Sequence, residues 1–168
     1  HGDTFNIPIE VLETRYPLNL TWLGLWHEGT LWGCQGRQRL EYVLPHVSPS
    51  GITGAPAVTR TVVDAGLRQL GEAAVRALQP RPHGIFFVDL KGDRHGQPRV
   101  TEVNAGRFGT TLHFYSAAGA NFPELAVELA LGRPPAAPRL DPLPADLYWL
   151  RTLDCGPVLC RGADLDPE

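Results

Sequence analysis

The 168-residue chain is 43% hydrophobic with a formal net charge of −3, which suits one domain with a buried core and leaves no basic run for a nucleic-acid partner. It has no apolar stretch near the roughly 20 residues that a membrane span needs, and its polar amino end lacks the apolar region of a signal peptide. Its three cysteines have no metal-like spacing, so we expect reduced thiols and a cytoplasmic protein.

Three segments of the amino-terminal part alternate between apolar and polar residues, as strands do. They are residues 5–12, 18–26 and 31–43. Gly29 lies between the second and third segments and predicts a hairpin turn with a positive φ. The Pro-, Ser- and Gly-rich residues 45–56 predict a loop. Apolar residues near the helical period then predict a helix from Ala57 to about Leu78, which two prolines would end.

The remaining segments predict a hairpin, a second helix and a last pair of strands. In chain order, they are hairpin strands over 84–90 and 99–104, a Gly- and Thr-rich loop over 106–118, a helix over 122–131, a Pro-rich connector over 133–144, and strands over 147–153 and 158–161. Asn121 can cap the helix and Gly132 can end it. The order predicts an α+β fold, with a mainly antiparallel sheet and two helices packed on it.

The hairpin carries the most informative residues of the chain. Asp89 ends an apolar strand, and Glu102 and Asn104 lie two residues apart on the next strand, so their side chains share one face. If the two strands pair, three oxygen-bearing side chains converge, and hard oxygen donors suit Mg²⁺ beside phosphates. The alternative is an exposed hairpin with ordinary surface acids.

The hairpin and the segments after it resemble a known family. Gly-Ile-Phe-Phe-Val-Asp at 84–89, Val-Thr-Glu-Val-Asn-Ala-Gly-Arg at 100–107 and the Gly- and Asn-containing helix at 118–132 are similar to the carboxyl-terminal part of an ATP-grasp domain. The pattern is that of the carbamoyl-phosphate synthase large subunit and similar carboxylate–amine ligases. The resemblance implies that residues 1–132 are the carboxyl-terminal ATP-grasp subdomain. Residues 133–168 are then a connector and a terminal strand pair packed on the same domain.

The resemblance also implies roles for the hairpin residues. Glu102 takes the place of a carboxylate that bridges two Mg²⁺ ions on ATP, Asn104 is an amide ligand to one ion, and Asp89 is the first metal ligand; Mn²⁺ in place of Mg²⁺ is left open. Arg107 resembles the catalytic arginine that grips the transferred phosphoryl group, a task that suits a guanidinium fork. One residue more than usual separates Arg107 from Asn104.

For the other charged residues, the sequence allows both a functional and a purely structural interpretation. Arg37 and Arg39 alternate with Glu41 on one strand face, which lines the nucleotide cleft or is simply solvated. Lys91 lies near a phosphate or is a turn residue, as Asp93 is. His46 and residues 48–53 form a substrate-facing loop or an ordinary turn.

The resemblance implies a function and also what the chain lacks. Lys91 is the single lysine, and no Gly-rich phosphate loop precedes the hairpin, so we expect an amino-terminal subdomain or a partner chain to supply them. The chain is then the Mg-ATP-binding half of a ligase that joins a small carboxylate to an amine or thiol through an acyl-phosphate, inactive alone. The alternatives are a non-catalytic ATP-grasp-like module for binding or assembly, and an unrelated α+β metal protein. A homodimer is left open.

Overall fold

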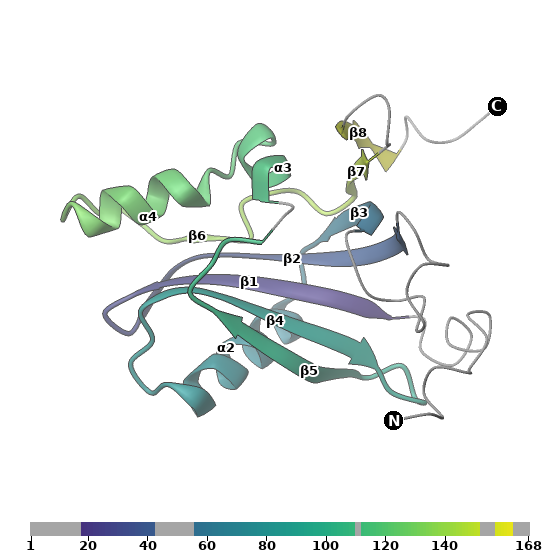
Figure 1. Cartoon of the computed structure of the whole chain (residues 1–168), viewed down its shortest axis with the longest axis horizontal. Helices are drawn as coiled ribbons and strands as arrows, with labels where there is room; N and C mark the ends of the chain where they lie inside the picture. Colours follow the sequence, from purple (N-terminus) through teal and green to yellow (C-terminus); the bar gives the residue numbers. More distant parts are fainter. Residues whose placement is uncertain (1–17, 43–55, 110–111, 152–156, 163–168) are drawn as a thin grey trace.

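The protein is one mixed sheet with helices on both of its faces (Figure 1). A computed structural model describes residues 18–42, 56–109, 112–151 and 157–162. The described strands are β1 (Asn19–His27), β2 (Thr30–Tyr42), β3 (Pro56–Val62), β4 (Gly84–Gly92), β5 (Pro98–Ala105), β6 (Arg139–Leu140), β7 (Leu147–Arg151) and β8 (Pro157–Arg161). The described helices are α2 (Ala65–Leu78), α3 (Leu112–Ala117) and α4 (Phe122–Ala130).

The strands run in the order β5-β4-β1-β2-β3-β7-β8 across the sheet, and all of these neighbours are antiparallel. The exception is β6, which pairs in parallel with β2 at Gly33 and Cys34, beyond the point where β3 leaves that strand. The expected α+β fold with a mainly antiparallel sheet is therefore confirmed. The strand expected over residues 5–12 lies outside the described residues, as do residues 45–55 of the loop expected over 45–56, whose last residue begins β3.

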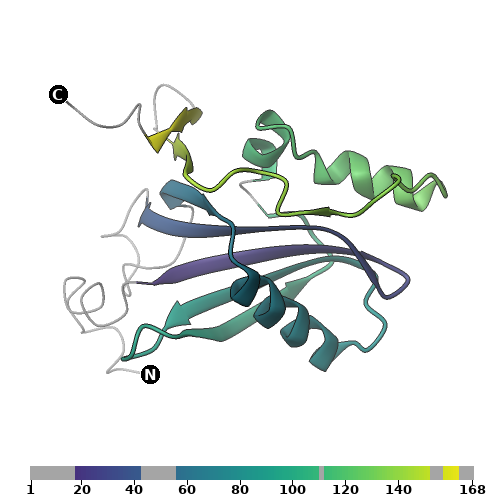
Figure 2. The ribbon, with the colours of Figure 1, turned by 180° about the vertical axis from the view of Figure 1, so that it is seen from behind.

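Each face of the sheet buries its own apolar cluster. On one face α2 covers a cluster that includes Trp22, Val88 and Leu90, and Figure 2 shows this helix crossing in front of the central strands. On the other face α3 and α4 cover a second cluster, which includes Leu23 and Phe87. The alternation along β1 and β4 supplies both faces, because successive side chains of a strand point to opposite sides.

The helix expected from Ala57 begins later than predicted. Residues 56–62 form β3, and α2 starts after Asp64, whose Oδ1 accepts a hydrogen bond from the backbone N–H of Leu67 at 2.6 Å. The apolar spacing that suggested one long helix spans two elements. Five of the six residues over 58–63 are β-branched, which favours a strand, and aspartate is a residue type that caps helices.

Two further expectations are corrected on the α4 side of the sheet. Residues 112–117, expected within a loop, form the short helix α3, so the described residues hold three helices and not two. The Pro-rich connector over 133–144 contains β6. The expected α4 is confirmed, with the Asn121 side chain accepting from the backbone N–H of Glu124 at 3.2 Å and Gly132 at φ +71° just beyond its end.

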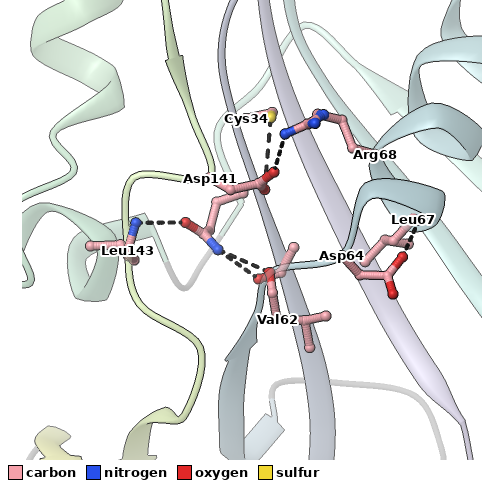
Figure 3. A network of polar contacts seen from close by, with 9 residues as sticks. Cys34, Val62, Asp64, Leu67, Arg68, Asp141 and Leu143 are labelled. Carbon is pink, nitrogen blue, oxygen red and sulfur yellow. Dashed lines mark hydrogen bonds and ion pairs between the residues drawn. The ribbon is translucent and has the colours of Figure 1, made fainter.

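The connector is fastened to the sheet by a network of polar contacts (Figure 3). The carboxylate of Asp141 accepts hydrogen bonds from Nη1 of Arg68 at 2.7 Å and from the thiol of Cys34 at 3.8 Å. The side-chain oxygen of Gln35 accepts a hydrogen bond from the backbone N–H of Leu143 at 3.1 Å. Burial raises the pKa of Cys34 to about 12, and nearby Asp141 adds to this rise. Burial also raises the pKa of Asp141, against the opposing effect of Arg68. The thiol of Cys34 therefore stays protonated and structural.

The described helices include none that is long and apolar enough to cross a membrane.

Candidate functional site

The candidate site lies on the half of the sheet that α3 and α4 leave uncovered. On the face that these helices share, the apolar side chains of Leu23 and Phe87 belong to the covered cluster. Two residues away on the same strands, the same face carries Thr21 and Asp89. Since residues two apart on a strand point to the same side, the face changes from apolar to polar where the helices end.

The register of the β4–β5 hairpin, which has a tight turn at Asp93 and one shift in the pairing between Asp89 and Leu90, brings the acidic residues together. Oδ1 of Asp93 accepts hydrogen bonds from the backbone N–H groups of His95 at 2.8 Å and Gln97 at 3.0 Å, and its Oδ2 accepts from Nε of Arg99 at 2.9 Å. The Gln97 contact, then those of His95 and Arg99, lower the pKa of Asp93. Asp93 is therefore a turn residue, as predicted.

This register places Asp89 directly opposite Glu102, with Phe87 opposite Asn104. The row continues across the neighbouring strands, where Thr21 pairs with Asp89 and Arg37 pairs with Thr21. Side chains directly opposite on antiparallel strands have β-carbons about 4.5–5.5 Å apart. The oxygen donors predicted from the sequence are therefore neighbours on one face.

These residues line one cleft of about 520 Å³. Its walls contain seven of the eight side chains that the sequence suggested for the nucleotide cleft, the metal or the phosphoryl group, and Glu41 is the exception. The seven are Arg37, Arg39, Asp89, Lys91, Glu102, Asn104 and Arg107. Four of the seven carry positive charge and two carry negative charge, so the cleft has a cationic excess although the chain has a net charge of −3. Such a cleft attracts an anionic ligand.

Asp89 is held by two neighbours in this cleft. Its Oδ1 accepts a hydrogen bond from Oγ1 of Thr21 at 2.8 Å and forms an ion pair with Nη2 of Arg39. The same Thr21 oxygen accepts from Nε of Arg39 at 3.0 Å and from its Nη2 at 2.6 Å. The three side chains come from three adjacent strands, and each contacts the other two.

Four other predicted residues, in contrast to Asp89, have no side-chain partner in the described structure. Within the described parts of the chain, no side-chain hydrogen bond or ion pair is made by Glu102, Asn104, Lys91 or Arg107. Glu102 and Arg107 are exposed, and Arg107 follows Gly106, whose φ of +83° turns the chain at the end of β5. A phosphate group could therefore contact Lys91 and Arg107, and a cation Glu102 and Asn104, without breaking an existing side-chain contact.

The donor types fit a divalent cation. Asp89, Glu102 and Asn104 offer carboxylate and amide oxygens, which are the ligands that Mg²⁺ uses beside phosphates. Across the described residues, no group of three or more His, Cys, Asp or Glu could hold a metal ion by itself. The set is thus typical of a metal bound together with a phosphate ligand, and not of a closed structural site.

Two residues that line the cleft were not predicted from the sequence, although the alternation along their strand indicates them. Asn19 and Thr21 also line it, and they are the polar residues that alternate with Leu18, Leu20 and Trp22 along β1. Glu41, grouped with the two arginines by alternation, does not line it, because β2 has register irregularities on both sides of Glu41. His46 and residues 48–53 lie outside the described residues.

No known protein-family model matches the chain, and no curated protein matches it in sequence. Solved structures do match. The biotin carboxylase domain of Hydrogenobacter thermophilus 2-oxoglutarate carboxylase, solved with MgADP, ADP and bicarbonate, matches 80% of this chain at a TM-score of 0.55 and 11% identity. An ATP-grasp superfamily protein from Archaeoglobus fulgidus matches 86% at 0.52 and 17%. Biotin carboxylase from Campylobacter jejuni, solved as a β-γ-ATP complex, matches 82% at 0.54 and 11%.

This is the fold of ATP-grasp proteins. At such identities the similarity shows the fold alone, and this fold agrees with the one that the resemblance of the hairpin implied. The chain spans 29%, 45% and 30% of these three structures, respectively, so it corresponds to less than half of each.

Proposed function

We propose that this chain is the metal- and phosphate-binding part of an ATP-dependent ligase that joins a small carboxylate to an amine or a thiol. The observation that supports the proposal is the cleft, in which seven side chains suggested by the sequence come together. Oxygen donors for a cation and cationic groups for phosphates lie on one sheet face. The ligase resembles the carbamoyl-phosphate synthase type in its hairpin sequence.

Each residue has a role in this proposal. Glu102 and Asn104 hold Mg²⁺, with Asp89 as a further ligand, and the bound ion neutralises the β- and γ-phosphates of ATP. Lys91, Arg37 and Arg39 contact phosphate oxygens of the nucleotide. Arg107 holds the phosphoryl group as it passes to the carboxylate oxygen, because a guanidinium can bind two of its oxygens at once. The acyl-phosphate formed is then attacked by the amine or thiol, which displaces phosphate.

We also propose that residues 1–132 work as one ATP-grasp subdomain, that residues 133–168 pack on it, and that a second unit grips the other side of the nucleotide. The chain has a single lysine, and apart from Arg107 and Gly109 the described residues that line its cleft all belong to strands of one sheet. Without the opposing unit, the chain binds MgATP weakly and does not turn it over. Robust ATPase activity of this chain alone would contradict this part of the proposal.

Weak binding can be located residue by residue. At 18.4 kDa the chain suits amide NMR, and a titration with MgATP should shift the amides around Lys91, Glu102 and Arg107 first. Glu102→Gln should reduce the shifts severalfold, because it removes a charge that holds the ion. Glu128→Gln is the matched control, since Glu128 lies on α4 and pairs with Arg133 at 2.8 Å. Shifts spread over the surface, or equal effects of the two variants, would reject the site.

One observation favours a second function, a non-catalytic binding or assembly module on the ATP-grasp fold. Asp89, a proposed metal ligand, is already engaged by Arg39 and Thr21. If this pairing is permanent, the cleft would bind an anion without a metal. ADP titrations with and without Mg²⁺ separate the two functions, because equal shifts in both would favour the module.

A further inference from the structure

The Asp89 carboxylate has a positively charged partner built into the fold. Arg39, Thr21 and Asp89 lie on β2, β1 and β4, and each of these side chains contacts the other two. The side chains of Arg39 and Asp89 are only 15% and 22% exposed. At this burial the guanidinium is ordered by two neighbours and not by a chance surface encounter.

The opposite carboxylate shows why such a partner is needed. Asp89 and Glu102 face each other directly across β4 and β5, and like charges in this arrangement destabilise a sheet. Glu102 is exposed, and in the described segments its side chain has no ion-pair partner. Arg39 therefore neutralises one member of the facing pair while Glu102 stays open to the cleft.

We propose that Arg39 is an internal counter-ion that competes with a divalent cation for Asp89 and is released from it when metal and nucleotide bind. The inference rests on the proposed function, because it concerns the same cleft. The cation then enters at Glu102 and Asn104, and Asp89 joins only when its contact with Arg39 breaks. The guanidinium that leaves Asp89 stays on the cleft wall, where it can donate to phosphate oxygens. Arg39 is thus a positioning residue that couples metal binding to phosphate binding.

The test measures binding of Mn²⁺ alone, without nucleotide, by the loss of the free-ion electron paramagnetic resonance signal. Arg39→Gln removes the competitor, so this variant should bind Mn²⁺ about fivefold more tightly than the unchanged chain, equivalent to about 1 kcal/mol. Arg60→Gln is the matched control. Arg60 lies on the next strand, contacts Gln38 at 2.7 Å and does not line the cleft, so losing its charge should leave Mn²⁺ affinity unchanged.

Each outcome decides a different point. Equal or weaker Mn²⁺ binding by Arg39→Gln, together with weaker binding by Glu102→Gln, would overturn the counter-ion role and leave the metal site standing. The same gain in Arg60→Gln would reduce the effect to net charge and also overturn the role. Absence of Mn²⁺ binding in both the unchanged chain and Arg39→Gln would overturn this inference and the metal part of the proposed function together.

A second measurement needs no destabilising variant. The Nε–H resonance of Arg39 in the unchanged chain, assigned by its loss in Arg39→Lys, should move and exchange faster with water as Mg²⁺ is added. Because this Nε–H donates to Oγ1 of Thr21, a resonance that keeps its position and protection while the amides near Glu102 shift would show that Arg39 stays in its place between Thr21 and Asp89, and would overturn the proposal.

Discussion

One face of the sheet has two halves that use the same strands for opposite purposes. Towards the β1–β2 turn, Leu23 and Phe87 lie under α3 and α4 and are excluded from water. Towards the other end, Thr21 and Asp89 line a polar cleft. On each strand this face changes from apolar to polar within two positions of the sequence, and Phe87 contributes to both halves. The covered half therefore supplies stability, and it holds the strands in the register on which the open half depends.

The largest effect is expected from a variant that removes a buried side chain from the covered half. Phe122 is 1% exposed at the start of α4 and packs over Gly33. We expect Phe122→Ala to lower the free energy of unfolding by about 3–5 kcal/mol, because it deletes buried contacts and leaves a cavity. Val127→Ala on the exposed side of the same helix should change it by less than about 0.5 kcal/mol. Denaturant titrations measure both, and similar losses would contradict this role of α4.

The covered half can also be tested by pH. Burial raises the pKa of Tyr115, on α3, from 10.0 to about 12. Below pH 10.0 its hydroxyl is protonated in both states, so its contribution is fully present; as pH rises towards 12, the unfolded chain ionises first and stability is lost. Near pH 11 the loss should be roughly 1–2 kcal/mol, and Tyr115→Phe should remove it. Unfolding measured at neutral and alkaline pH checks this, and an unchanged pH dependence in the variant would contradict it.

These two tests concern contacts that the sequence made partly predictable. The alternation along 18–26 and the apolar run over 84–90 predicted strands, and Asn121 and Gly132 marked both ends of α4. The start of α2 was misjudged because Val58, Val62 and Leu67 fit a helical spacing even though a strand and a helix meet between them. Asp64 carried the correct signal, since its side chain caps the helix.

The site was predictable where it depends on one hairpin and not where it depends on several strands. Asp89, Glu102 and Asn104 lie on the two strands of one hairpin with a short turn at Asp93, and a shift in the pairing between Asp89 and Leu90 places Asp89 opposite Glu102. The pairing of Arg39 with Asp89 joins residues 50 apart in sequence and requires β2, β1 and β4 to be aligned. Thr21 was missed for the same reason, because a lone threonine in an apolar strand gains a role only when its neighbours are known.

A smaller effect is expected from two buried threonines, of which one has hydrogen-bond partners for its hydroxyl and the other has none among the described residues. The Thr21 hydroxyl donates to Asp89 and accepts from Arg39, whereas Oγ1 of Thr59, on β3, is buried and has no hydrogen-bond partner in the described structure. Thr21→Val should cost about 0.5–1.5 kcal/mol of unfolding free energy. Thr59→Val has nearly the same shape and removes an unsatisfied hydroxyl, so it should be neutral or stabilising. Equal costs would show that the hydroxyl of Thr21 adds nothing to the open half.

The smallest expected effect on stability belongs to Lys91, at the outer edge of the open half. Its ammonium group has no side-chain partner among the described residues, so Lys91→Gln should change the free energy of unfolding by less than about 0.5 kcal/mol. Its effect should appear in ligand binding, because Lys91 lines the cleft and pairs across the sheet with Asn19. We expect MgATP-induced amide shifts to need severalfold more nucleotide in the variant, with the difference shrinking as salt screens the charge. Arg94→Gln removes the same charge three residues away in the hairpin turn, outside the cleft, and should leave the titration unchanged. If both variants weaken binding equally, the open half attracts nucleotide only by its overall charge, and Lys91 does not contact phosphate.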